Sequence, residues 1–241
     1  MKKSDIKSYI ESNKDDINNI IAKNLLSKNM YAGFAKARIM IENQVLMPSK
    51  SGTPNNVIPL LLNYTYIQNQ QSTFDYIIKS PFAVIDGCAI REVHSCLCKN
   101  TNIRGGAPRL FECQLAKLNI YPPDYNIAIQ KMNDVYYYMS DANLEPVAKA
   151  MRVHFDMIAI QPFTDYNKRT TRMIMNWVLM KNHYSPIIFH HVKDRDKYLK
   201  AIAEKAKSNN GEYELFMLNT MLRTQNEFIK VLKNSQAFKA P

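Results

Sequence analysis

The sequence has no apolar run long enough to cross a membrane and no apolar core of a secretory signal peptide. The 241 residues contain no stretch of 18 consecutive apolar residues, which is about the shortest run of a transmembrane helix. Three lysines lie in the first seven residues, and Glu11, Asp15 and Asp16 follow soon after, so the h-region of a Sec signal is missing. We therefore expect a cytoplasmic protein with no membrane partner, while delivery by a specialised secretion system would leave no mark here.

The chain has only four cysteines, and their spacing does not fit a structural zinc site. They are Cys88, Cys96, Cys98 and Cys113, and one residue between Cys96 and Cys98 is too few for a zinc-binding pair. Buried free thiols in a reducing compartment are expected. The sequence has no internal repeat and no low-complexity tract, and its hydrophobic share of 46% is ordinary for a globular domain, which argues against wholesale disorder.

What the chain has in excess is positive charge, with a formal net charge of +11. A basic protein is attracted to polyanions such as nucleic acid and anionic membranes. The lysines are scattered along the chain and form no cluster in one arm, which favours a solvated basic surface. Nucleic-acid binding is therefore the least favoured interpretation, and the sequence makes no prediction of oligomeric state.

Apolar periodicity indicates a helical protein. The expected helices cover residues 4–29, 31–45, 56–70, 84–99, 125–139, 193–206 and 212–235, with two further helices inside 144–182. His94, on the fourth of these segments, is interpreted as a packed or surface histidine. The two helices inside 144–182 are joined by residues 160–172. Pro162 and the polar run 164–167 interrupt the helical pattern there.

This junction has the chemistry of an anion site. Asn167 is expected to cap the second helix by accepting a hydrogen bond from a backbone N–H two or three residues on. A helix N-terminus offers free N–H groups and a favourable dipole to an anion, and Lys168, Arg169 and Arg172 add three cations. Asp165 could hold a divalent metal or pair with an arginine. The combination suits a nucleotide pyrophosphate with Mg²⁺.

The junction resembles the signature of the Fic (filamentation induced by cAMP) family, His-Pro-Phe-x-Asp/Glu-Gly-Asn-Gly/Lys-Arg-x-x-Arg. The matching residues are Pro162, Phe163, Asp165, Asn167, Lys168, Arg169 and Arg172. Gln161 stands where the family has its catalytic histidine, and Tyr166 stands where it has glycine or alanine. The resemblance covers roughly residues 30–205, including a Gly-x-x-Arg segment from Gly106 to Arg109.

The resemblance implies an all-α fold, a Fic-type helical bundle with a short β-hairpin flap around residues 110–120. It implies an N-terminal helical extension over 1–30, a Fic-like core over 31–206 and a C-terminal helix over 207–241 packed on that core. In the family, the flap registers an extended segment of a protein target by strand addition. Gly106, Arg109 and Leu110 would be the flap residues here, and a protein target would be the partner.

By the same resemblance, the cofactors would be ATP and Mg²⁺. Gln161, Asp165, Asn167 and Arg169 would occupy the catalytic positions, with Asp165 as the metal ligand. The nucleotide would contact Thr164, Tyr166, Asn167, Lys168, Arg169 and Arg172.

A helix over residues 31–45 resembles the inhibitory helix of one Fic branch, which has the pattern Ser/Thr-x-x-x-Glu-Gly/Asn. Glu42 and Asn43 match, whereas Arg38 occupies the Ser/Thr position. In that branch the glutamate pairs with the second signature arginine, which is Arg172 here, and so competes with the terminal phosphate of the nucleotide. The alternative is that Glu42 is a surface carboxylate on an amphipathic helix.

The two departures from the signature affect activity in different ways. The family histidine removes a proton from the target hydroxyl, whereas the Gln161 amide can only orient a hydroxyl, and loss of a general base costs roughly 10² to 10⁴ in rate. His154 lies about 10 Å away along the helix and is not expected to substitute. Tyr166 disfavours the positive φ that glycine permits, and its ring could fill part of the nucleotide pocket.

Three hypotheses follow from these residues. The chain is a Fic pseudoenzyme or very weak nucleotidyltransferase with a partial phosphate site, an active protein adenylyltransferase (AMPylation) or related phosphotransferase with an altered mechanism, or a basic nucleic-acid-binding protein. Gln161 could be an engineered change, but Tyr166 beside it favours natural divergence.

Overall fold

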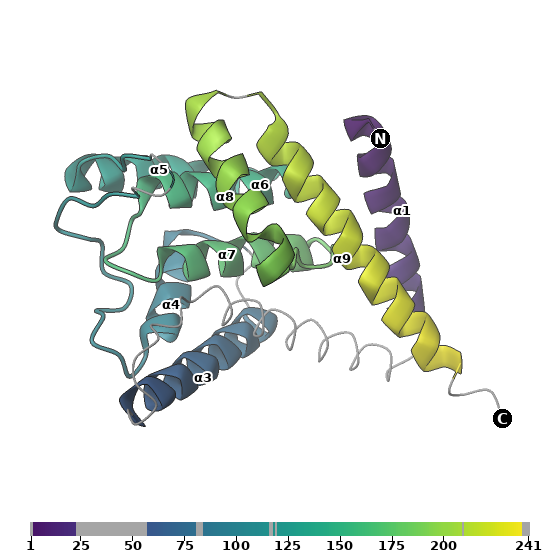
Figure 1. The fold of residues 1–241 in the computed structure, drawn as a ribbon, viewed down its shortest axis with the longest axis horizontal. Coiled ribbons are helices and arrows are strands. Elements are labelled where there is room, and N and C mark those ends of the chain that lie inside the picture. The colour runs from purple at the N-terminus through teal and green to yellow at the C-terminus, as the bar shows by residue number, and fades with distance from the viewer. Residues whose placement is uncertain are drawn as a thin grey trace. The chain divides into compact units, whose positions relative to one another are not determined.

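The computed structural model describes residues 2–22, 57–80, 84–115, 118, 120–208 and 210–237. Within these ranges the helices are α1 (Lys3–Ala22), α3 (Val57–Lys79), α4 (Gly87–Cys98), α5 (Tyr125–Ser140), α6 (Pro146–Ile160), α7 (Asn167–Lys181), α8 (His191–Lys207) and α9 (Glu212–Ala237) (Figure 1). The same ranges contain two isolated β-bridges and no regular strand. The all-α fold is therefore confirmed, and the helix predicted over 56–70 continues to Lys79.

The chain divides into two compact units. One unit is formed by Met1–Glu42 together with Leu179–Pro241, and the other by Asn43–Val178. Helices α1, α8 and α9 lie in the first unit, and α3 to α6 with most of α7 lie in the second. The boundaries suggested by the sequence near residues 30 and 206 stay predictions.

In the first unit, α1 and α8 both pack against α9. Helix α1 contributes the buried stripe Ile6, Ile10 and Ile17, which recurs at helical spacing and stabilises the unit by about 1.5–3 kcal/mol per side chain. Two polar contacts fix the register of this packing. The Gln225 amide donates to the Ile10 carbonyl at 3.1 Å, and the Tyr184 hydroxyl donates to the Glu11 carboxylate at 2.6 Å.

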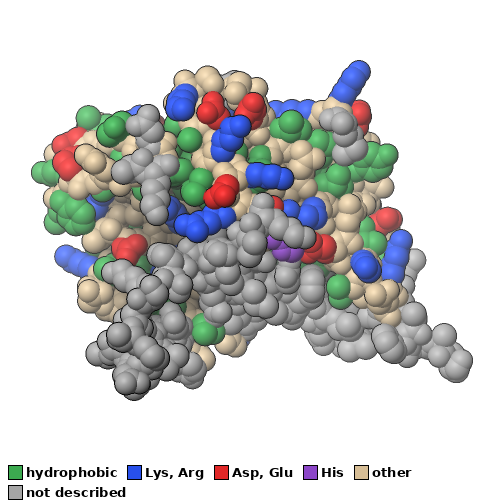
Figure 2. All heavy atoms as spheres, viewed as in Figure 1, with side chains coloured by type: hydrophobic (Ala, Val, Ile, Leu, Met, Phe, Trp, Pro, Cys, Tyr) green, Lys and Arg blue, Asp and Glu red, His purple; other side chains and the backbone are tan. Residues whose placement is uncertain are grey.

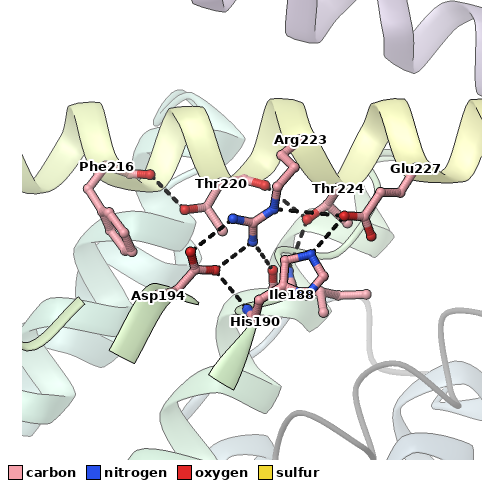
Figure 3. Close-up of polar contacts among 8 residues, drawn as sticks. All are labelled: Ile188, His190, Asp194, Phe216, Thr220, Arg223, Thr224 and Glu227. Atoms are coloured by element: carbon pink, nitrogen blue, oxygen red, sulfur yellow. Dashed lines mark hydrogen bonds and ion pairs between the residues drawn. The ribbon is translucent and has the colours of Figure 1, made fainter. Parts of the chain in front are cut away.

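A polar cluster joins α8 to α9 in the same unit (Figure 3). Arg223 on α9 donates to both carboxylate oxygens of Asp194, at 2.9 and 2.6 Å, and to the Ile188 carbonyl at 2.9 Å. Asp194 also accepts from the His190 N–H at 2.7 Å, and the His190 ring lies 2.8 Å from Glu227. Burial raises the pKa of Asp194, but the bonds from Arg223 and His190 outweigh it and lower the pKa below its ordinary value.

In the second unit, acidic residues start three helices. Asp86 accepts from the Ala89 N–H at 2.9 Å before α4, and Asp124 accepts from the Asn126 N–H at 2.8 Å before α5. Glu145 accepts from two N–H groups before α6, where Pro146 occupies the first helical position. A carboxylate at a helix N-terminus satisfies free donors and complements the dipole, and proline is tolerated there because that N–H needs no intrahelical partner.

All four cysteines are free, but only Cys98 is buried and Cys88 is exposed, so the expectation of buried thiols is wrong for three of them. Burial raises the pKa of the Cys98 thiol to about 12. Among the described residues, no helix combines the length and hydropathy of a membrane span. Lysine and arginine side chains are spread among acidic ones over the face that Figure 2 presents.

Candidate functional site

The loop between α6 and α7 contains two non-glycine residues in the left-handed region. Gln161 ends α6 with φ 49° and ψ 63°, and its N–H donates to the Met157 carbonyl at 3.1 Å. Tyr166 has φ 59° immediately before α7. A left-handed residue other than glycine costs roughly 1–2 kcal/mol, so surrounding contacts must hold both ends of this loop. Backbone strain of this kind is concentrated at functional sites.

The Gln161 side chain turns back onto its own helix. It is 8% exposed, and its amide nitrogen donates to the Ile158 carbonyl at 2.8 Å. The side chain at the position of the family base is therefore engaged with α6, and an amide has no nitrogen that accepts a proton.

Asn167 does not cap α7 in the expected way. Its amide oxygen accepts from the Phe163 N–H at 2.9 Å, and its amide nitrogen donates to the Phe163 carbonyl at 2.7 Å. The first turn is closed instead by the Tyr166 carbonyl, which accepts from the Arg169 and Thr170 N–H groups at 3.0 and 2.9 Å. The cap prediction is wrong because the amide bonds both backbone groups of one residue upstream. The side chain thus closes the loop, and an anion site at the start of the helix stays a prediction.

The peptide group between Asp165 and Tyr166 is held from both sides. The Tyr166 N–H donates to the Asp165 carboxylate at 2.6 Å, and the Asp165 carbonyl lies 3.0 Å from Nε2 of His94. His94 is fully buried and stacks on Phe163 with ring centroids 3.9 Å apart. Burial lowers the pKa of His94 despite the opposing effect of Asp165. The interpretation of His94 as a packed histidine is confirmed. Asp165, in contrast, is exposed.

Tyr166 is packed with an arginine and a second tyrosine. Its ring meets Tyr66 of α3 edge to face, with centroids 5.8 Å apart, and the Arg169 guanidinium lies 4.3 Å from the Tyr166 ring centroid and 5.0 Å from that of Tyr66. Burial raises the pKa of Tyr166, Tyr66 raises it further, and Arg169 opposes them without cancelling the rise. The signature arginine therefore rests on two aromatic faces.

The remaining cationic and histidine positions differ in accessibility. Thr164 and Lys168 are exposed, whereas Arg172 is buried and its Nε donates to the Lys168 carbonyl at 3.0 Å. His154 is completely buried, and burial together with Arg172 lowers its pKa to about 3, so it is neutral near pH 7. Glu42 and Asn43 lie outside the described residues, and their proposed inhibitory role stays a prediction.

Arg109, which the resemblance assigns to the flap, is buried against the end of α6. Its side chain is 1% exposed, and Nε donates to the Gln161 carbonyl at 2.8 Å while a terminal nitrogen donates to Phe111 at 2.7 Å. The other terminal nitrogen bonds the Pro123 carbonyl and reaches the Ile160 carbonyl at 3.4 Å. The guanidinium thus neutralises the carbonyl end of α6 and clips the flap segment to it. It does not face outward toward a target.

The flap segment itself contains little regular structure. The Pro108–Phe163 bridge joins its start to the signature loop, and a Leu115–Ile120 bridge is all that the described residues show of the expected hairpin. Leu110 is 71% exposed and Tyr121 is 73% exposed. The segment therefore presents large apolar side chains to solvent beside the loop.

Tyr66 was missed by sequence reasoning. It lies 100 residues before Tyr166 in a helix whose apolar pattern gave it no distinction. Only the packing of α3 beside the loop brings it to Arg169. Within the described residues, no group of three or more His, Cys, Asp or Glu side chains could hold a metal ion.

Comparison with known proteins relates this loop to a family. Residues 85–179 match the sequence model described as the Fic/DOC family. The protein adenylyltransferase Fic of Nematostella vectensis is 27% identical over 190 residues, which is 75% of this chain and 40% of that protein. The protein adenylyltransferase fic-1 of Caenorhabditis briggsae is 25% identical over 117 residues, covering 47% of this chain and 22% of that protein. The chain thus spans well under half the length of these curated relatives.

Solved structures agree on the fold. Fic-1 (residues 134–508) from C. elegans has a TM-score of 0.73 at 15% identity, covering 96% of this chain and 74% of that one. A structure of IbpAFic2 covalently tethered to Cdc42 has a TM-score of 0.52 at 15% identity, covering 91% of this chain and 70% of that one. At 15% sequence identity, the similarity to these two structures shows a shared fold and nothing about function.

Proposed function

We propose that the chain is a degenerate protein of the Fic/DOC family, which its residues 85–179 match. In this proposal it binds a nucleoside triphosphate at the start of α7 and transfers the nucleotide group to a target hydroxyl, with release of pyrophosphate, slowly or not at all. The observation that carries this proposal is Gln161, whose amide is bonded to the Ile158 carbonyl at 2.8 Å. A target hydroxyl beside Gln161 would meet an amide that cannot take its proton. The histidine of α6, His154, is buried and its pKa is lowered to about 3, so it is a poor base.

The retained features support binding of phosphate. The loop keeps a left-handed residue before α7, a conformation that glycine adopts readily, and a helix N-terminus favours an anion. The exposed Lys168 ammonium adds a cation, and a helix N-terminus with a cation favours a polyphosphate.

Asp165 fits a magnesium ligand. Asp165 is exposed beside the start of α7. At a nucleotide, Mg²⁺ is usually held by one or two protein carboxylates together with phosphate oxygens and waters. Mg²⁺ bound there would neutralise negative charge on the phosphates.

The Tyr166 ring weakens the site. It occupies the position next to α7 and takes Arg169 onto its face at 4.3 Å, although this guanidinium would otherwise be suited to phosphate oxygens. Both consequences favour weak nucleotide binding and slow chemistry.

A protein partner at the flap is the second part of the proposal. Leu110, Phe111 and Tyr121 are 71%, 50% and 73% exposed, and large apolar side chains grouped along one segment are typical of a protein-binding surface. The structural neighbour tethered to Cdc42 shows a protein target for that protein only.

The reducing cytoplasm remains the expected location.

The alternative is an active protein adenylyltransferase with an altered base. It is favoured by the names of the relatives and by the retained Asp165, Arg169 and Arg172. Nucleic-acid binding is the third alternative, and on the face in Figure 2 basic side chains are interspersed with acidic ones.

Two measurements test the proposal. Calorimetric titration with ATP and Mg²⁺ should show binding that weakens at least about fivefold in Asp165→Asn, as expected for loss of a charged ligand. Transfer from labelled ATP onto the protein itself should be absent or barely detectable. No binding of any nucleoside triphosphate at about 1 mM, the upper end of ordinary KM values, would refute the proposal, and rapid transfer would favour the active alternative.

Repair of the signature tests the mechanism. Gln161→His with Tyr166→Gly should restore transfer, with Glu42→Gly added so that inhibition does not mask a gain. Gln161→His alone should restore less, since Tyr166 would still hinder phosphate docking. Arg169→Ala in the repaired background should abolish the signal. If the triple change gives no transfer from any nucleotide, the site has diverged beyond these positions.

A further inference from the structure

We propose that His94 is a positioning residue that links Gly106, at the base of the flap, to the Asp165 carbonyl in the α6–α7 loop. This link would fix the position of a target segment relative to a bound nucleotide. The functional meaning of this link rests on the proposed function. The geometry comes from three segments that are far apart in the chain: α4, the turn at Gly106 and the loop at Asp165.

Two hydrogen bonds fix the chemical form of the His94 ring. The Gly106 N–H donates to Nδ1 at 2.8 Å, so Nδ1 carries no proton. Nε2 lies 3.0 Å from the Asp165 carbonyl, which can only accept, so Nε2 carries the proton and donates it. The neutral ring with hydrogen on Nε2 is the one form that satisfies both contacts.

Packing prevents the His94 ring from moving toward one of its two hydrogen-bond partners without moving away from the other. It is 0% exposed, and it stacks on Phe163 at 3.9 Å with an angle of 10° between the rings. Phe163 belongs to the loop and bridges Pro108 of the flap segment. A rotation of the His94 ring that lengthened one bond would therefore also disturb the other.

On the loop side, His94 sets the peptide group that precedes Tyr166. Its bond fixes the Asp165 carbonyl, while the Tyr166 N–H is fixed by the Asp165 carboxylate at 2.6 Å. The orientation of this peptide determines φ of Tyr166, which is 59°. His94 thus helps a tyrosine to keep a conformation that the family assigns to glycine, and it orients the residue that carries the magnesium-binding carboxylate.

On the flap side, Gly106 is pressed against the same helix. Its φ is 73°, and a Cβ atom there would lie 2.7 Å from Oγ of Ser95 and 3.1 Å from the Arg91 carbonyl oxygen. The backbone therefore approaches α4 more closely than any side chain would permit. The Gly106 N–H reaches Nδ1 because of this approach, and the flap begins three residues further on at the Arg109 clip.

A matched pair of substitutions separates the two bonds. In His94→Asn the side-chain oxygen can take the place of Nδ1 and keep the Gly106 bond, whereas the Asp165 bond is lost. In His94→Gln the side-chain NH₂ can take the place of Nε2 and keep the Asp165 bond, whereas the Gly106 bond is lost. His183→Asn, at an exposed turn, controls for the loss of a histidine.

The readouts are amide hydrogen exchange and nucleotide affinity. His94→Gln should speed exchange at the Gly106 amide by about tenfold or less, the range for one lost hydrogen bond, with ATP–Mg²⁺ affinity within about twofold of the parent. His94→Asn should leave Gly106 protected, speed exchange at Tyr166 and weaken ATP–Mg²⁺ binding several-fold. Equal effects of both variants on both amides, as a purely structural role would give, overturn the proposal.

The test remains decisive if other steps fail. If the parent binds no ATP, the proposed function fails while the exchange pattern at Gly106 and Tyr166 still decides the role of His94. If both variants fail to fold, ¹⁵N chemical shifts of the His94 ring in the parent protein decide. A proton on Nδ1 would exclude the arrangement, and a proton on Nε2 supports it.

Discussion

Replacement of Arg109 should unfold the flap attachment and lower the stability of the second unit. The guanidinium is 1% exposed and donates to the Gln161 and Phe111 carbonyls at 2.8 and 2.7 Å, with further bonds to Pro123 and Ile160. These acceptors come from the end of α6 and from two points of the flap segment. One cation therefore holds together backbone that has little regular hydrogen bonding of its own.

The expected magnitude follows from the number of bonds. Charge-assisted hydrogen bonds contribute roughly 1.5–3 kcal/mol each, and the three bonds to Gln161, Phe111 and Pro123 bring a total near 4–5 kcal/mol at the lower end of that range. Arg109→Ala should therefore cost roughly 3–5 kcal/mol after relaxation, a large part of the 5–15 kcal/mol typical of a domain. Arg109→Lys should cost about 2 kcal/mol, since a single ammonium cannot span the same acceptors.

Urea denaturation followed by circular dichroism measures these losses, with Arg104→Ala as the matched control. Arg104 is exposed and its replacement should change the free energy of unfolding by less than about 0.5 kcal/mol. If Arg109→Ala were as mild as the control, the guanidinium would not be holding the flap segment to α6.

Three further predictions concern buried charge and aromatic contacts. His154 keeps a pKa of about 3 in the folded protein because of burial and a neighbouring arginine, so its contribution to stability is full above about pH 6.5 and is lost as the pH falls toward 3. His154→Gln should reduce the loss of unfolding free energy between pH 7 and 5 by about 2 kcal/mol at most, and an NMR titration of the His154 ring above pH 5 would contradict this. Asp194 has a lowered pKa, so its bond to Arg223 stabilises above the ordinary aspartate pKa and is lost as the pH falls through the folded value. Asp194→Asn should cost roughly 3 kcal/mol at pH 7 and much less at pH 2 in urea titrations, and an equal cost at both would refute the assignment. Tyr66→Ala should tighten ATP binding about two- to fivefold by freeing Arg169 from one ring, whereas Tyr66→Phe should not, and calorimetry that finds the two variants alike would show that this contact does not restrain the arginine.

Over the described residues, the sequence by itself determined the helices and the position of the loop, while the helix predicted over 31–45 lies outside them. Apolar spacing of three and four residues is a local property, and the break at Pro162 follows from the missing N–H and the fixed φ of proline. For the same reason the set of reactive side chains from Asp165 to Arg172 was visible, because it lies within one short stretch. The failed cap at Asn167 marks the limit of local reasoning, since one amide had two nearby backbone partners and the sequence does not rank them.

Only the tertiary structure decided what these side chains touch. Tyr66 reaches Arg169 from 103 residues away, and His94 reaches Asp165 from 71 residues away. Arg109 reaches the Gln161 carbonyl from 52 residues away. A buried polar group is satisfied by whichever donor or acceptor the packing brings within about 3 Å. That choice depends on how helices far apart in the chain come together, which no pattern within a single segment records.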